Sequence, residues 1–258
     1  EMLLRVVVRR TALDEVVSSI SKDDRVLVEG DFIMGNNTTS SGKLTNGVLE
    51  VKGNVTQKTY GNQSNFLTTG GFKLLLSGEE GQSVNFANTS TSVSRIANLE
   101  ITNESVAGVT IGENDLCVTG TLTDNGNKVS GYVIVGPSCT ITDNKYEGNI
   151  CYVNSVTVNQ PLEIGGDILI GNYTVTFNYD VNVAGNLDLK DTLEFKGTNL
   201  NVAGNLNLNY GYLYLNGKTA NVAGNVSVTR GGIRLYGGKL YCEGNVNLNA
   251  YYDYSSYI

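Results

Sequence analysis

The sequence has no histidine and no tryptophan, and its 258 residues include only two prolines and two methionines. The absence of histidine removes the commonest general base and the commonest metal ligand, although it leaves carboxylate catalysis possible. No apolar run approaches the length that crosses a membrane, so we expect no membrane insertion. The sequence predicts no catalytic residue, no metal site and no cofactor.

Positive charge is also scarce, since 18 Lys and Arg residues face 25 Asp and Glu residues. The resulting net charge of −7 excludes nucleic acid as an expected partner, because nucleic-acid binders concentrate positive charge. The chain has 31 glycines, and 40% of its residues are hydrophobic. This composition indicates a folded, β-rich protein rather than a disordered one.

There are four cysteines, Cys117, Cys139, Cys151 and Cys242, and none of them forms a CxxC motif. A zinc site is therefore not expected. Cys242 occupies a repeat position that is valine elsewhere, which predicts a buried free thiol acting as a small hydrophobic residue. One disulfide among the other three cysteines is compatible with their spacing, and the sequence leaves the pairing open.

A repeat between residues 181 and 248 dominates the chain. Four lines read VNVAGNLDL, LNVAGNLNL, ANVAGNVSV and LYCEGNVNL, and their glycines (Gly185, Gly204, Gly224, Gly244) are spaced by 19, 20 and 20 residues. A period of about 20 residues, built only from strand formers and Gly/Asn turns, is typical of a β-solenoid. We therefore predict an all-β, single-stranded β-solenoid with rungs of about 20 residues, a rung being one turn of the coil.

Alternation within each repeat predicts which side chains form the core. Leu206 and Leu208 should point inward while Asn207 points outward, and the same pattern recurs one repeat later and one repeat earlier. A second alternating segment follows in each repeat, for example Leu213 and Leu215. Equivalent inward residues of successive rungs should stack in columns, so that stability accumulates with the number of rungs.

An asparagine follows each bend glycine, and these residues should also stack (Asn186, Asn205, Asn225, Asn245). Asparagine tolerates turn conformations, and a column of amides can form hydrogen bonds along the stack. The alternative is a row of ligands for a cation. We favour the structural interpretation, because asparagine is common in turns for its own conformational reasons.

The rest of the chain divides into a cap and a solenoid. Residues 1–20 do not fit the repeat and predict an N-terminal cap, helical from Thr11, with residues 3–8 as either strand or helix. Residues 21–258 should form the solenoid, with irregular wide rungs over about 72–150, regular rungs over about 160–250, and projecting loops at 35–43 and 58–65. Residues 30–44 align without gaps with 244–258, which suggests a segment of a longer tandem array.

Several phrases, among them VLVEGDF, LEVKGNVTQ, FKLLLSG and VNVAGNLDL, resemble the β-solenoid repeats of large secreted, adhesin-like cell-surface proteins of Gram-positive bacteria. The resemblance covers about residues 24–258. It implies a stalk, fibre or adhesive surface located outside the cell, and it implies no particular activity.

Enzymes on the same fold, the right-handed β-helix polysaccharide lyases and hydrolases, are the main alternative. Their chemistry would need clustered carboxylates, and the candidates are Asp188, Asp191 and Glu194. The next rung has Asn207, Tyr210 and Tyr214 at the equivalent places, so no acidic pair recurs. We therefore predict that the protein is not an enzyme.

Tyrosines and arginines at or beside outward positions form a candidate binding face: Tyr210, Tyr212, Tyr214, Arg230, Arg234, Tyr236 and Tyr241. Such rings can bind sugar rings or a partner surface, because tyrosine offers contact area at low entropic cost. Alternatively, outward tyrosines only stabilise strands by packing between rungs.

Our hypothesis from the sequence is an extracellular structural or adhesive β-solenoid, a rigid stalk or fibre segment of a bacterial surface protein. Its expected partners are itself or further repeats, stacked end to end into a filament, together with glycans or a host surface. The alternative is a polysaccharide-binding or polysaccharide-degrading β-helix protein.

Overall fold

The structure is a computed structural model that describes residues 7–8, 20, 24–35, 37–59, 63–249 and 256–258. The chain forms a parallel, single-stranded β-solenoid of about 11 turns, as the repeat predicts. It divides into two compact units, residues 1–142 (unit 1) and 143–258 (unit 2). Within the described ranges, the model contains no helix whose length and apolar character would let it cross a membrane.

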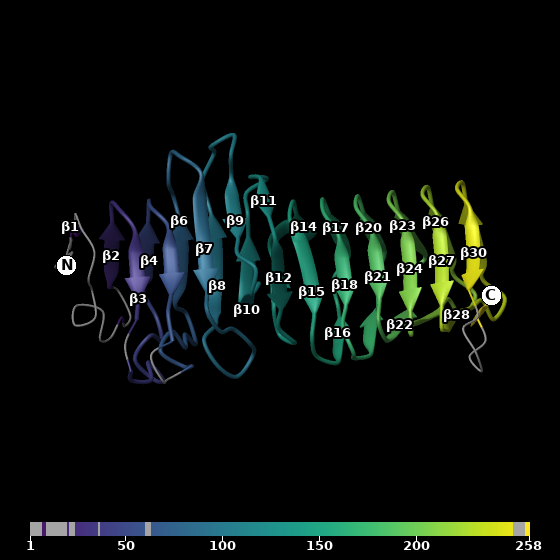
Figure 1. The fold of residues 1–258 in the computed structure, drawn as a ribbon, viewed down its shortest axis with the longest axis horizontal. Coiled ribbons are helices and arrows are strands. Elements are labelled where there is room, and N and C mark those ends of the chain that lie inside the picture. The colour runs from purple at the N-terminus through teal and green to yellow at the C-terminus, as the bar shows by residue number, and fades with distance from the viewer. Residues whose placement is uncertain (1–6, 9–19, 21–23, 36, 60–62, 250–255) are drawn as a thin grey trace. The chain divides into compact units, whose positions relative to one another are not determined.

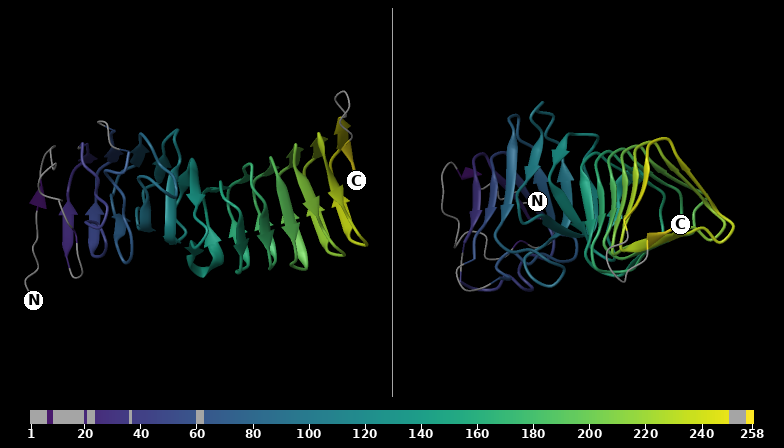
Figure 2. Two further views of the ribbon diagram at one scale, coloured as in Figure 1. Left: turned by 90° about the horizontal axis from the view of Figure 1, so that it is seen from below. Right: turned by 45° about the vertical axis from the view of Figure 1, so that its right-hand side comes forward.

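In unit 2 each turn contributes one strand to each of three parallel sheets, and Figure 2 shows these turns stacked one behind another. The first sheet contains β14 (Lys145–Tyr146), β17 (Leu162–Ile164), β20 (Val181–Val183), β23 (Asn199–Val202), β26 (Thr219–Val222) and β29 (Lys239–Cys242). The second contains β15 (Asn149–Tyr152), β18 (Ile168–Ile170), β21 (Leu187–Leu189), β24 (Leu206–Asn209), β27 (Val226–Thr229) and β30 (Val246–Asn249). The third contains β16 (Val156–Val158), β19 (Val175–Phe177), β22 (Thr192–Phe195), β25 (Tyr212–Tyr214), β28 (Gly231–Arg234) and β31 (Ser256–Tyr257).

The register of these sheets confirms the predicted columns. Leu187 pairs with Leu206 and Leu206 pairs with Val226, so each turn advances the chain by 19 or 20 residues. All three side chains are fully buried. Burying one such side chain contributes about 1.5–3 kcal/mol, which explains why an alternating sequence closes into a coil once rungs can stack.

The Gly-Asn bends stack as closely as the strands. A Cβ atom on Gly204 would collide with the carbonyl group of Gly185, and one on Gly224 would collide with that of Gly204. Behind these glycines, Asn186 Oδ1 accepts hydrogen bonds from the backbone N–H (2.9 Å) and the side-chain Nδ2 (3.0 Å) of Asn205. The predicted hydrogen bonding along the asparagine column is confirmed.

Unit 1 has two long sheets and a third side made of isolated bridges. The first sheet contains β1 (Val7–Val8), β2 (Arg25–Val28), β4 (Val48–Val51), β6 (Lys73–Leu76), β8 (Ile96–Ile101), β10 (Leu116–Thr123) and β12 (Tyr132–Val135), and β13 (Thr140–Ile141) also pairs with β10. The second contains β3 (Phe32–Met34), β5 (Val55–Gln57), β7 (Gln82–Phe86), β9 (Val109–Ile111) and β11 (Val129–Ser130). Bridges Ile20↔Leu44, Leu44↔Thr68 and Leu67↔Arg95 form the third side.

The turns of unit 1 are wider than those of unit 2. Arg25 pairs with Val48 and Val48 pairs with Lys73, which gives 23 and 25 residues per turn. Wide turns therefore begin at β2 rather than near residue 72. The extra residues form the excursions around 35–43 and 58–65, which are visible at the purple and blue end of Figure 1.

Buried amides accompany these wide turns. Gln57 and Asn65 are fully buried and joined by a 2.6 Å hydrogen bond from Gln57 Nε2 to Asn65 Oδ1. Asn65 Nδ2 in turn donates to the Lys58 carbonyl (2.6 Å), and Gln57 Oε1 accepts from the backbone N–H of Ala87 (2.9 Å). Because wide loops leave backbone groups inside the coil, buried amides are needed to satisfy them.

Two expectations concern the ends of the chain. The predicted helix from Thr11 lies outside the described residues, whereas Val7 and Val8 form a strand that pairs in parallel with Leu27 and Val28. Cys242 does pair with Val222 in the expected column, but it is half-buried rather than buried. Its neighbours Val246 and Leu248 are likewise 46% and 47% exposed.

Candidate functional site

The most concentrated group of exposed aromatic and basic side chains lies on the third sheet of unit 2. We call it the Tyr–Arg cluster, and it consists of Tyr210, Tyr212, Tyr214, Arg230, Arg234 and Tyr236. Strands β25 and β28 position it, because Tyr212 pairs with Gly232 and Tyr214 pairs with Arg234. Gly232 has no side chain, which leaves room for Arg234 beside Tyr212.

Arg234 is the centre of this cluster. Its guanidinium carbon lies 5.7 Å from the ring centre of Tyr212 and 5.5 Å from that of Tyr214. Its Nη1 donates a 3.1 Å hydrogen bond to the hydroxyl oxygen of Tyr236. Tyr214 and Tyr236 stack with their ring centres 6.4 Å apart. One arginine therefore holds three tyrosine rings in fixed positions, through cation–π contacts and a hydrogen bond.

The remaining members sit in bends with left-handed backbone. Tyr210, Arg230 and Tyr236 have φ values of 68°, 56° and 43°. Such conformations are uncommon for residues with large side chains. They bring the Arg230 guanidinium carbon to 4.9 Å from the ring centre of Tyr210. Tyr210 and Tyr236 are 52% and 63% exposed, so the cluster presents aromatic area to solvent.

Tyr241 is not part of this cluster. It lies on β29 in the first sheet, where it pairs with Asn221, and it is 55% exposed. The sequence placed Tyr241 with the other tyrosines because its position alternates outward, but outward positions on different sheets face different directions. The structure therefore brings together six of the seven predicted residues.

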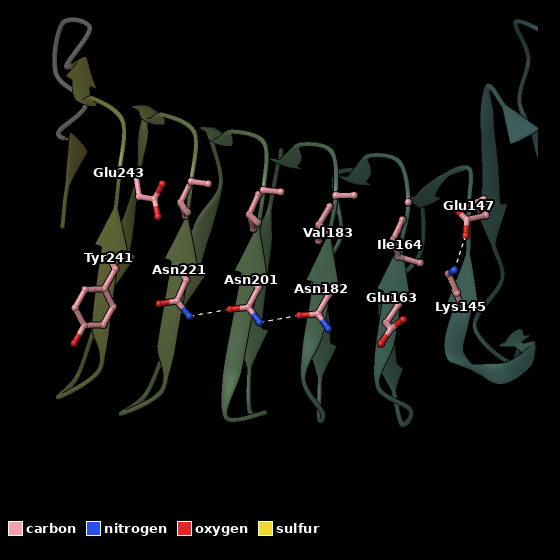
Figure 3. Close-up of a pocket in the computed structure, with 16 residues that line it drawn as sticks. Lys145, Glu147, Glu163, Ile164, Asn182, Val183, Asn201, Asn221, Tyr241 and Glu243 are labelled. Atoms are coloured by element: carbon pink, nitrogen blue, oxygen red, sulfur yellow. Dashed lines mark hydrogen bonds and ion pairs between the residues drawn. The ribbon is translucent and has the colours of Figure 1, made fainter. Parts of the chain in front are cut away.

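Tyr241 instead contributes to a groove of about 570 Å³ on the outer face of the first sheet. Figure 3 shows its side chains in two rows that cross the strands. The middle row contains Lys145, Glu163, Asn182, Asn201, Asn221 and Tyr241, and the second row contains Glu147, Gly165, Ala184, Ala203, Ala223 and Glu243. The sequence analysis missed this groove, although the aligned AGN motifs contain its alanines.

No family model, curated protein or solved structure matches the chain. Argument about function therefore rests on the chemistry of these two surfaces.

The candidate carboxylates have structural partners. Asp188 Oδ1 accepts a 2.7 Å hydrogen bond from Asn207 Nδ2, and Asp191 Oδ1 accepts one of 2.7 Å from the backbone N–H of Thr192. Glu194 forms an ion pair of 3.8 Å with Lys196. Each of the three carboxylates is thus engaged separately, on β21, in a bend and on β22, and they do not converge on a common point.

All four cysteines are free thiols. Burial raises the pKa of Cys117 to about 12, and burial together with the nearby Cys117 raises that of Cys139 to about 12. Thiols with such pKa values are almost entirely protonated at neutral pH and are poor nucleophiles. The sequence left one disulfide open, and the structure contains none among these residues.

Proposed function

We propose that this chain is a non-enzymatic structural and adhesive β-solenoid that presents the Tyr–Arg cluster to a glycan or a host surface. The observation that carries the proposal is the arrangement of Arg234 with Tyr212, Tyr214 and Tyr236. Exposed rings of fixed orientation lose little conformational entropy when they bind, and arginine adds donors suited to hydroxyl and carboxylate groups.

The solenoid supports this role by its rigidity. Each rung is tied to the next by parallel strand pairing, by buried columns and by the asparagine column. A side chain placed on such a frame keeps its position relative to its neighbours, which is what a recognition surface requires. The frame also suits a stalk or fibre segment, because it lengthens by one strand spacing per rung.

A binding measurement tests the proposal. Immobilised glycans and host-cell extracellular material are titrated with the wild-type chain and with Tyr212→Ala, Tyr214→Ala and Arg234→Ala. We expect each substitution to weaken binding at least tenfold. Tyr173→Ala is the matched control, because Tyr173 is a 43% exposed tyrosine of the same unit outside the cluster. Equal weakening by the control, or no effect of the cluster substitutions, would rule out this face.

We also propose that the chain acts outside the cell, as its resemblance to secreted surface repeats implies. Antibody labelling of intact cells checks this, with a known cytoplasmic protein as the control for leakage. Labelling that requires lysis would contradict an extracellular location.

End-to-end stacking is the proposed mode of self-association. Val226 and Val228 are fully buried, whereas the next residues of their columns, Val246 and Leu248, are 46% and 47% exposed on β30. A further rung from another repeat or a second copy would bury them by strand pairing. Electron microscopy over a concentration series should show filaments that Leu248→Lys abolishes, and short rods at every concentration would exclude self-assembly.

A further inference from the structure

The groove on the first sheet of unit 2 contains a hydrogen-bonded row of amides. Asn201 Nδ2 donates to Asn182 Oδ1 (2.7 Å), and Asn221 Nδ2 donates to Asn201 Oδ1 (2.8 Å). These asparagines lie at the centres of β20, β23 and β26, with side chains on the outer face, as Figure 3 shows. They are distinct from the bend asparagines, which take part in turns.

The two asparagine ladders differ in what they leave available. In the bends, Asn186 Oδ1 accepts from both the backbone and the side chain of Asn205, so its lone pairs are used within the solenoid. In the groove, Asn201 uses one N–H and one lone pair in the ladder. An amide has two N–H groups and two lone pairs, so Asn201 retains one donor and one acceptor for a ligand. The ladder fixes the orientation in which they are presented.

Small residues beside the amide row form the floor of the groove. Ala184, Ala203 and Ala223 are exposed and follow their strands directly. Their backbone N–H groups continue the strand pairing, with Ala203 donating to the Val183 carbonyl (2.8 Å) and Ala223 to the Val202 carbonyl (2.9 Å). The floor is therefore rigid and apolar, while the amide row beside it is polar.

The groove runs across the strands, along the solenoid axis of unit 2. Parallel strands are about 4.8 Å apart, so the six strands from β14 to β29 give a length of roughly 24 Å. Each rung repeats one amide and one small residue at a spacing close to the length of one pyranose residue in a linear chain. A polymer lying along the groove would meet the same pair of groups at each sugar, with ring C–H groups over the alanines and hydroxyls at the amides.

The charges at the two ends limit the kind of polymer. Glu147 and Glu163 line one end and Glu243 lines the other, whereas Lys145 is the basic residue of the lining. Lys145 forms a 2.7 Å ion pair with Glu147, so its charge is offset locally. Glu147 also reaches over the floor, since a Cβ atom on Gly165 would lie 2.7 Å from Glu147 Oε2. Net negative charge disfavours uronate or sulfate groups, while carboxylates accept hydrogen bonds from neutral hydroxyls.

We propose that this groove binds a linear neutral glycan of roughly five residues, lying along the solenoid axis at one sugar per rung. Tyr241 closes the β29 end of the amide row and offers a ring for stacking against the terminal sugar. The site lies on a different sheet from the Tyr–Arg cluster, so it extends the proposed function without depending on it.

Isothermal titration of the full chain with defined oligosaccharides tests the proposal. The probes are linear neutral oligomers of glucose, N-acetylglucosamine, mannose and xylose, each from dimer to hexamer, together with an acidic galacturonate hexamer. For at least one neutral series we expect the dissociation constant to fall with each added sugar and to level off near the pentamer. The acidic hexamer should bind at least tenfold more weakly.

Matched variants localise the binding. Asn201→Leu removes the donor and acceptor at the centre of the row, and Ala203→Gln fills the floor without changing charge. Both should weaken binding at least tenfold. Asn207→Leu is the control, because Asn207 is an outward asparagine of the same rung on the second sheet and also donates to a neighbouring side chain. Circular dichroism melting confirms that each variant is folded.

Three results would overturn the assignment: no neutral series binds at millimolar concentration, Asn207→Leu weakens binding as much as Asn201→Leu, or the acidic hexamer binds as tightly as the neutral one. Loss of neutral-glycan binding in Tyr212→Ala, with Asn201→Leu unaffected, would place the glycan on the Tyr–Arg cluster instead. The groove and the proposed function can therefore fail separately.

Discussion

Asn205 donates two hydrogen bonds to the single side-chain oxygen of Asn186, from its backbone N–H (2.9 Å) and from its side chain (3.0 Å). Asn225 repeats the backbone contact to Asn205 Oδ1 at 2.8 Å. One rung earlier, Asp167 Oδ1 accepts from the backbone N–H of Asn186 at 2.6 Å. The column therefore requires an acceptor oxygen at each bend, and either an amide or a carboxylate provides it.

This requirement predicts different effects for two substitutions of Asn205. Asn205→Ala leaves the Asn225 N–H without its acceptor and should lower the free energy of unfolding by about 1–2 kcal/mol. Asn205→Asp keeps the acceptor, as Asp167 does naturally, and should cost less than half as much at neutral pH. Urea denaturation measures both. Equal losses for the two variants would show that the oxygen is not what matters.

Close stacking of the bends predicts a contrast between two glycines of unit 1. A Cβ atom on Gly53 would collide with the carbonyl group of Gly30, whereas one on Gly30 would have nothing within 4 Å. Gly53→Ala should therefore destabilise the protein by about 1–3 kcal/mol, because the backbone must shift to accommodate the methyl group. Gly30→Ala is the matched control and should change stability by less than about 0.5 kcal/mol. Thermal and urea unfolding compare the two, and similar losses would contradict the stacking geometry.

The bend carboxylate Asp180 predicts a pH dependence. Its Oδ1 accepts hydrogen bonds from the backbone N–H of Thr198 (2.5 Å) and of Asn199 (3.1 Å), and the bond from Thr198 is the main reason that the pKa of Asp180 lies below its ordinary value. A lowered folded-state pKa contributes stability above the unfolded-state value of about 4, and this stability is lost as the pH falls through the folded-state pKa.

Asp180→Asn tests that dependence, because asparagine retains an acceptor oxygen without the charge. We expect the variant to be less stable than wild type by about 1 kcal/mol at pH 7, a value limited by solvent screening at this exposed bend. The difference should vanish as the pH is lowered below about 4. A difference that stays constant from pH 7 to pH 3 would mean that the charge of Asp180 contributes nothing.

The four thiols should differ in reactivity. Cys117 and Cys139 have pKa values raised to about 12 by burial, and Cys151 is also buried, whereas Cys242 is half-buried. A thiol reagent at pH 8 should therefore modify Cys242 first, and Cys242→Ser should remove the fast phase. Unfolding without reductant should then expose four titratable thiols in the wild-type chain. Only two would reveal a disulfide that the structure does not contain.

The sequence predicted the fold of unit 2 almost completely, because its side-chain alternation and its glycine spacing state the same period. Leu187, Leu206 and Val226 stack as expected, and the asparagines beside them form hydrogen bonds as expected. The wide turns of unit 1 were harder to predict. Their bends are satisfied by buried amides such as Gln57 and Asn65, which are far from any repeat motif.

The candidate surfaces were predicted less well, since alternation says that a residue points outward but not which side of the coil it occupies. Tyr241 and Tyr214 both alternate outward, yet β29 and β25 belong to different sheets. The left-handed bends at Tyr210 and Arg230 were also invisible, because nothing in the local sequence distinguishes them from strand residues. Cys242 matches its valine column and is nevertheless half-buried, because burial depends on the next rung.

The most direct test of the central claim, binding without chemistry, is to analyse polysaccharides after prolonged incubation with the chain. The products of a panel of neutral and acidic polysaccharides are sized by chromatography, and ultraviolet absorbance detects unsaturated ends. We expect bound polymers of unchanged length and no new ends. Shortened chains, formed by the wild type and abolished by Asp188→Asn, would show that the solenoid is an enzyme and would contradict the account.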